Sequence, residues 1–188
     1  ALLIPCILHL ENHVGEEIIT MILRKGLERF QGPASNYIQD LEDVIQRKVL
    51  GSDTSPSHWK LRWSRSADGA HQIEPIQEHN TTVRCMMNSI SLLIESAFSN
   101  GDNEDKTKLI LACSKYSQAI ELLTAHCILT DEELDMFQEL IDDFFQIWIE
   151  LFSTEGMMNY IHLLGAGHIL YFLQKYKCLY IYSQQGWE

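Results

Sequence analysis

Positive charge is scarce in this chain of 188 residues. Lysines and arginines together number 14, against 26 aspartates and glutamates, so the formal net charge is -12. Such a balance repels the phosphates of DNA, and it argues against a nucleic-acid-binding surface that covers most of the chain. A local basic patch remains compatible with it.

The scarcity is complete between Tyr116 and Gln174, where ten acidic residues occur without a single lysine or arginine. A solvated acidic face is one explanation for such a stretch. A docking face for a basic partner or a basic neighbouring domain is the other. The sequence leaves both open.

Paired cysteine spacing is missing as well. The five cysteines are scattered through the chain and include no C-x-x-C pair. Disulfide frameworks and zinc ribbons have regular, paired spacings. We therefore expect mostly buried free thiols in a reducing, intracellular compartment.

Long apolar runs are absent too. None reaches the roughly 18 residues that a membrane-spanning helix requires, so we expect no membrane partner. The opening stretch ALLIPCILHL has no basic segment before it and continues into charged residues, so we expect no targeting peptide. Because an initiator methionine is lacking, we expect residues 1–188 to be a single helical domain cut from a longer chain.

Helical periodicity is present almost throughout, and 46% apolar residues supply a core. The pattern predicts an all-α fold of five to seven amphipathic helices in an irregular bundle, with one long loop at about 51–75. The expected helices cover 6–30, 35–50, 80–98, a stripe from 109 to 127, a segment from 130 to beyond 151, a piece ending near 164, and 168–176.

Local signals mark several helix ends. Thr130 followed by Glu133 predicts a capping box, and Gly51 predicts a helix C-cap. Gly165 and Gly167 permit a break near the end of the chain.

The long loop contains the sequence HWKLRWSR, in which aromatic and cationic residues alternate. Aromatic rings stack on bases and cations hold phosphates. The candidate nucleic-acid-binding residues are Trp59, Lys60, Arg62, Trp63 and Arg65. The alternative is that both tryptophans lie on one side of a short strand at 58–63 and pin the loop to the core.

Histidine pairs are the candidate metal ligands. A break at Gly165 or Gly167 would bring His162 and His168 together, but zinc needs two more ligands. Only His126, Cys127 and Cys178 are nominal candidates. Two packed or hydrogen-bonded histidines are the ordinary alternative.

No complete catalytic set is visible. His9 and His13 have the spacing of a metal pair on a helix, but no glutamate directly follows the first histidine, as H-E-x-x-H requires. Asp142 and Asp143 are adjacent on a helix and diverge by about 100°, so they do not converge on one ion. We expect both aspartates to be solvated.

The closing segment IHLLGAGHILYFLQKYKCLYIYSQQGWE combines two histidines, a helix, an aromatic–serine position and a Gln-Gly-hydrophobic-Glu turn. It resembles a segment of transposon-encoded and transposon-derived proteins with a ribonuclease-H-like transposase core. IPCILHLENHVGE resembles the opening of the same segment in uncharacterised invertebrate proteins of this type. The matching residues of the closing segment are His162, His168, Tyr182, Ser183, Gln185, Gly186, Trp187 and Glu188.

These transposases carry two aspartates on strands and a final glutamate on a helix that follows an inserted helical region. The resemblance implies that this chain is that insertion, that Glu188 is the last metal-binding acid, and that the longer parent acts on DNA in the nucleus. Two Mg²⁺ ions about 4 Å apart would be held by all three acids. One carboxylate cannot hold them, so the resemblance implies that the chain is inactive alone.

The sequence departs from the family in three respects: neither earlier aspartate can be located, the core strands are absent, and the helix expected after Glu188 is missing. A non-catalytic helical module for protein–protein interaction therefore stays open as the alternative function. A zinc-stabilised helical domain is a third. The oligomeric state is not predicted.

Overall fold

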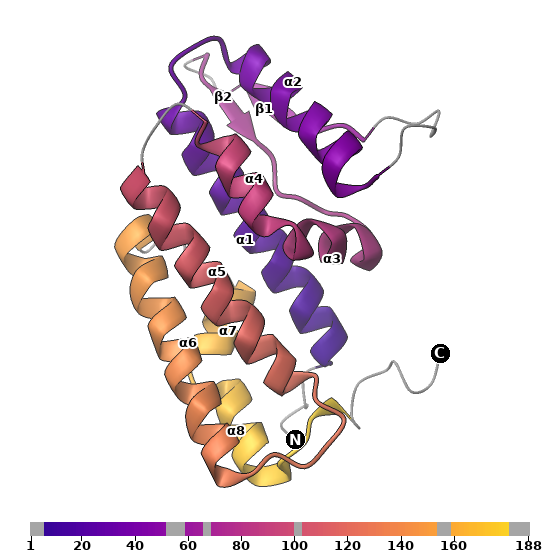
Figure 1. Ribbon diagram of the computed structural model, residues 1–188, viewed down its shortest axis with the longest axis vertical. Coiled ribbons are helices and arrows are strands. Elements are labelled where there is room, and N and C mark those ends of the chain that lie inside the picture. Colours follow the sequence, from indigo (N-terminus) through magenta and orange to yellow (C-terminus); the bar gives the residue numbers. More distant parts are fainter. Residues whose placement is uncertain (1–5, 52–58, 66–68, 100–102, 154–158, 181–188) are drawn as a thin grey trace. The chain divides into compact units, whose positions relative to one another are not determined.

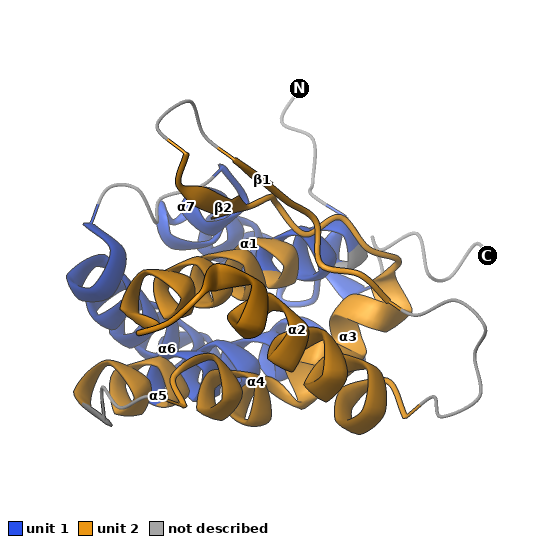
Figure 2. Ribbon diagram, turned by 90° about the horizontal axis from the view of Figure 1, so that it is seen from above, with its two compact units in different colours: residues 1–14, 111–188 blue, residues 15–110 orange. Residues whose placement is uncertain are grey.

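The computed structural model describes residues 6–51, 59–65, 69–99, 103–153 and 159–180. Within these residues it confirms an all-α fold, with eight α-helices and one small two-stranded sheet (Figure 1). The chain divides into two compact units, unit 1 with residues 1–14 and 111–188 and unit 2 with residues 15–110 (Figure 2). Two helices, α1 (Ile7–Arg29) and α5 (Asn103–Leu123), contribute residues to both.

Unit 2 is built mainly from helices around the second part of α1. The remaining elements are α2 (Ala34–Val44), a π-helical extension η1 (Ile45–Val49), β1 (Trp63–Arg65), β2 (His71–Ile73), α3 (Asn80–Asn88) and α4 (Ile90–Ala97). Ile18 and Ile22 of α1 are fully buried, as expected for apolar residues one helical turn apart.

The packing of α1 in unit 2 includes a glycine contact. Gly26 lies against the Tyr37 hydroxyl and the backbone carbonyl of Ala97, where a Cβ atom would not fit. The Tyr37 hydroxyl donates to the carbonyl oxygen of Leu23 at 2.8 Å. Burial raises the pKa of Tyr37 well above its usual value, so the hydroxyl keeps the proton that it donates.

Two predicted helices of unit 2 are altered in the structure. The segment expected at 35–50 ends in the π-helix η1, and Gly51 follows with a left-handed φ of 66°, as a C-cap requires. The segment expected as one helix at 80–98 is broken at Ser89, whose φ of -108° and ψ of 20° lie outside the helical range. This break raises the number of helices above the predicted five to seven.

The predicted strand at 58–63 is misplaced. The strand β1 begins at Trp63 and pairs with β2 in an antiparallel hairpin, with Trp63 opposite Ile73 and Arg65 opposite His71. Ile73 is fully buried, and Arg24 of α1 donates from Nε to its carbonyl oxygen at 2.8 Å. The hairpin is therefore attached to unit 2 through β2.

Unit 1 contains the second part of α5 together with α6 (Asp131–Phe152), α7 (Asn159–Gly165) and α8 (His168–Tyr176). Its core is aromatic. Trp148 is fully buried, with ring centroids 5.4 Å from Phe144 and 4.3 Å from Phe152. The predicted stripe on α5 is buried from Leu109 to Leu123, but the helix ends there and Cys127 is exposed beyond it.

The predicted helix ends of unit 1 are confirmed. Thr130 caps α6: its Oγ1 accepts from the Glu133 amide at 3.2 Å, and the Glu133 carboxylate accepts from the Thr130 amide at 2.7 Å. Between α7 and α8 the chain breaks at Gly167, which has a left-handed φ of 78°. Across the part of the chain that the structure describes, no helix is both long and apolar enough to cross a membrane.

Candidate functional site

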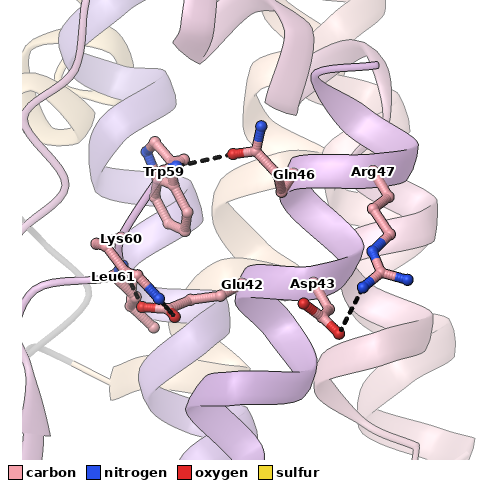
Figure 3. A network of polar contacts seen from close by, with 7 residues as sticks. All are labelled: Glu42, Asp43, Gln46, Arg47, Trp59, Lys60 and Leu61. Carbon is pink, nitrogen blue, oxygen red and sulfur yellow. Dashed lines mark hydrogen bonds and ion pairs between the residues drawn. The ribbon is translucent and has the colours of Figure 1, made fainter. Parts of the chain in front are cut away.

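The candidate nucleic-acid-binding residues lie on an extended segment of unit 2, and its first part, with Trp59 and Lys60, runs beside α2 and η1 (Figure 3). The Trp59 amide donates to Gln46 Oε1 at 2.7 Å, and the Leu61 amide donates to Glu42 Oε1 at 2.9 Å. Alternate residues of an extended chain are about 6.6–6.8 Å apart, and four residues of a helix rise about 6 Å. Because these spacings match, two acceptors one helical turn apart can accept hydrogen bonds from alternate amides of the segment.

The two tryptophans of this segment have different roles. Trp59 is half-buried, and its indole Nε1 donates to Glu78 Oε1 at 2.9 Å. Leu61 is buried beside it. Trp63 is 42% exposed. The hypothesis that both tryptophans pin the loop to the core is therefore right for Trp59 and wrong for Trp63.

The cations of the segment also differ. Lys60 Nζ contacts Glu42 Oε2 at 2.8 Å, so part of its charge is neutralised (Figure 3). Arg62 and Arg65 are exposed, and neither guanidinium has an ion pair or hydrogen bond with the residues that the structure describes. Of the three predicted cations, these two are available to an external anion.

Side-chain directions divide the hairpin into two faces. Residues opposite each other in an antiparallel pair point to the same face. Trp63, Arg65, His71 and Ile73 therefore share one face, and the Trp63 and His71 ring centroids are 5.0 Å apart. Arg62 belongs to the opposite face, because side chains alternate along an extended chain.

A cavity of about 700 Å³ lies between α2 and the extended segment, and we call it the α2 groove. Its volume is in the range of ligand-binding pockets. Its lining residues are Ser35, Ile38, Gln39, Glu42, Asp43, Gln46, Arg47, Trp59, Lys60, Leu61 and Trp63. The two cations among them are paired with the two acids, since Arg47 lies 3.6 Å from Asp43 and Lys60 pairs with Glu42.

Sequence reasoning missed the α2 side of this groove. Glu42 and Gln46 are the acceptors that hold the segment, but they resemble ordinary polar positions on an amphipathic helix. Their spacing of four residues was the available signal, and Gln46 is buried to 6% exposure.

The Gly165–Gly167 break brings His162 and His168 together in unit 1. Their ring centroids are 6.2 Å apart, and both side chains are exposed. His9 and His13 also stack, with centroids 6.4 Å apart. However, the described part of the chain contains no group of three or more histidine, cysteine, aspartate or glutamate side chains that would hold a metal ion.

The other nominal zinc ligands have different contacts. The Cys178 thiol donates to the Ala125 carbonyl at 3.7 Å, and His126 stacks on Tyr180 with ring centroids 3.6 Å apart. All five cysteines are free, but only Cys113 and Cys178 are buried. Burial raises the pKa of Cys113 to about 12, so this thiol is unreactive at neutral pH.

Eight of the ten acids of the acidic stretch lie on α6, and seven of these are exposed. Asp142 and Asp143 are both exposed, as predicted. Lysines from outside the stretch contact two of its acids: Lys115 lies 2.6 Å from Asp143, and Lys177 contacts Asp131. These contacts favour a solvated face, and docking of a basic domain stays a prediction.

The remaining motif residues, Tyr182, Ser183, Gln185, Gly186, Trp187 and Glu188, lie outside the described residues. No protein-family model, curated protein or solved structure matches the chain.

Proposed function

We propose that this chain is the helical insertion region of a transposase-like DNA-processing protein. It contributes at most one metal-binding carboxylate, Glu188, and it does not act alone. The observation that supports a DNA contact is the exposure of Trp63 and Arg65 on one face of the hairpin and of Arg62 on the other. The resemblance of the closing segment supports the class of protein.

The hairpin residues suit a nucleic acid for two reasons. Trp63 offers an indole on which an unpaired base can stack, and Arg62 and Arg65 offer guanidinium groups that are not neutralised by described residues. The net charge of -12 opposes this contact only weakly, because salt screens acids that lie more than about 8–10 Å from the hairpin. Trp59 and Lys60 hold the segment in place.

The proposed cofactor is Mg²⁺ in the longer parent. The metal would activate water and stabilise the leaving oxygen of a phosphodiester, and it prefers carboxylate oxygens. The described residues provide no carboxylate cluster for it, so no catalytic step is assigned to them. Glu188 would supply one ligand and the parent the others.

DNA binding by the full 188-residue chain tests the contact. We expect Trp63→Ala to weaken binding of labelled single-stranded DNA about tenfold or more. Arg62→Gln and Arg65→Gln should each lower the slope of log affinity against log salt by about 1. Fluorescence anisotropy at several salt concentrations measures both effects.

Two control variants make this experiment specific. Trp63→Phe keeps an aromatic face and should retain most of the affinity. Lys48→Gln removes an exposed charge from η1, outside the hairpin. If the hairpin variants and Lys48→Gln have equal effects, the hairpin is not the contact.

The α2 groove favours a second candidate function, a non-catalytic helical module that binds another protein. Its four charged lining residues are paired with one another, which suits a polypeptide better than a polyanion. This candidate assigns no role to Glu188.

A further inference from the structure

The backbone of β1 has an open hydrogen-bonding edge. The Glu74 amide donates to the Arg62 carbonyl at 3.0 Å, and Trp63 is opposite Ile73. Hydrogen-bonded and non-hydrogen-bonded pairs alternate along an antiparallel ladder. Trp63 and Arg65 therefore belong to the non-hydrogen-bonded pairs, and their own N–H and C=O groups point away from β2.

The outer edge of β2 agrees with this alternation, and a side chain of α1 forms a hydrogen bond with it. The Ile73 carbonyl points away from β1 and accepts from Arg24 Nε. On the β1 side, Glu42 of α2 and Gln46 of η1 supply acceptors only for Leu61 and Trp59. Ile38 lies one turn before Glu42 on α2, and its aliphatic side chain cannot accept a hydrogen bond. Outside the strand ladder, no hydrogen bond among the described residues involves the backbone groups of Trp63 or Arg65.

An open strand edge is a site for pairing with another chain. This edge offers carbonyl acceptors as well as amide donors, and a peptide strand matches both. Phosphates match only the donors and are repelled by the carbonyl oxygens. The α2 groove beside the edge has paired, opposite charges and the apolar side chains of Ile38, Leu61 and Trp63. The surroundings therefore favour a polypeptide over a nucleic acid at this edge.

We propose that β1 accepts an extended peptide of a partner protein as a third strand, which lies in the α2 groove. Main-chain hydrogen bonds to Trp63 and Arg65 would hold it, as in other cases of strand addition. Specificity would come from side chains on the shared face: an apolar residue opposite Trp63 and, two residues away, an acidic residue opposite Arg65. The peptide would share Trp63 and Arg65 with the DNA contact, but it adds main-chain pairing and does not use Arg62, which points to the other face.

A blocked hexapeptide, acetyl-Thr-Val-Thr-Asp-Thr-Val-amide, tests the proposal. It places valine two residues to either side of the aspartate, so it fits β1 in either direction. Its counterpart has lysine in place of the aspartate. We expect calorimetric titration of the full chain to show several-fold tighter binding of the aspartate peptide.

Charge reversal identifies the residue that recognises the charged side chain of the peptide. Arg65→Glu should reverse the preference, so that the lysine peptide binds more tightly. Arg65→Gln should abolish the preference without reversing it. Arg62→Glu is the matched control, because it makes the same charge change on the opposite face, and the preference should survive it. Equal effects of Arg62→Glu and Arg65→Glu would overturn the proposal in favour of general charge attraction.

Alternate N-methylation of the peptide tests strand pairing directly. One peptide is methylated on the valine and aspartate nitrogens and a second on the threonine nitrogens. Only alternate amides of an added strand face β1. One pattern should therefore bind like the parent peptide and the other at least about tenfold more weakly.

Three further results would overturn the proposal: equal binding of both methylated peptides, no binding of the parent peptide, or binding of single-stranded DNA in place of the peptide at the Trp63 edge. The last result would leave the DNA contact standing. Peptide binding without any DNA binding would instead contradict the DNA contact alone.

Discussion

At the scale of single residues, close packing in unit 1 depends on Gly165. The ring of Phe145 occupies the space that a Cβ atom at this position would need. The closeness of this contact explains why α7 ends on a glycine. Gly165 thus determines the packing of α7, whereas the left-handed Gly167 makes the break at which His162 approaches His168.

We predict that Gly165→Ala destabilises the chain by about 1–3 kcal/mol, because the added methyl group overpacks a filled contact. Phe145→Leu should recover part of this loss in the double variant. Urea denaturation measures the free energy of unfolding, with Ala166→Ser at the exposed neighbouring position as a control. Unchanged stability in Gly165→Ala would contradict the packing.

The ion pair of Asp131 predicts a pH dependence. Lys177 donates a hydrogen bond to Asp131 and adds its positive charge, and both effects lower the pKa of this carboxyl below its ordinary value of 3.8. A depressed folded-state pKa stabilises the fold above the ordinary value, and the contribution is lost as pH falls through the folded-state pKa.

Asp131→Asn should therefore lower the urea midpoint slightly at about pH 7 and leave it unchanged at about pH 2.5. Lys177→Gln should reproduce the loss at neutral pH. High salt should reduce the difference, because the carboxylate is exposed. A difference between wild type and Asp131→Asn that persists at the acidic pH would contradict the assignment.

At the scale of elements, the start of α6 carries the clearest local signal. Thr130 and Glu133 satisfy each other's backbone amides. We predict that Thr130→Ala costs about 1 kcal/mol of stability, since the side-chain acceptor of the capping box is lost. Thr130→Ser keeps the hydroxyl and should be nearly neutral. Urea unfolding of the two variants distinguishes a cap from a surface threonine, for which both changes would be neutral.

Such elements were predictable from sequence because their signals are local. The apolar spacing of α1 and the capping box of α6 each depend on neighbouring residues in one helix. The hairpin was not predictable from sequence. Its strands of three residues are too short to show a clear alternation of side chains, and β1 pairs with residues that do not adjoin it in the sequence. The break at Ser89 was missed since Val83, Met86, Ile90 and Ile94 continue an apolar pattern across it.

The candidate site was predictable only in part, for a related reason. Alternating aromatic and cationic residues indicated the segment at 59–65. Which of these side chains form contacts within the chain depends on residues elsewhere in the sequence, namely Glu42 for Lys60 and Glu78 for Trp59. No pattern within the segment itself separates Trp59 from Trp63.

At the scale of the whole molecule, the net charge of -12 contrasts with the exposed Arg62 and Arg65 beside and on β1, which have no ion pair with the described residues. This distribution fits a region that supports a DNA-processing protein better than one that binds DNA over a broad surface. It also fits the proposal that catalysis requires acids of the parent in addition to Glu188.

The most direct measurement is Mg²⁺-dependent cleavage of DNA with the flanking terminal repeats by the full-length parent, comparing wild type with Glu188→Gln. The amide keeps the size of the side chain and removes its charge, and circular dichroism verifies that folding is intact. The proposal predicts that the wild type cleaves and that the variant loses cleavage, because a metal ligand is gone. Equal cleavage by both proteins would remove Glu188 from the mechanism and contradict the proposed role of the chain.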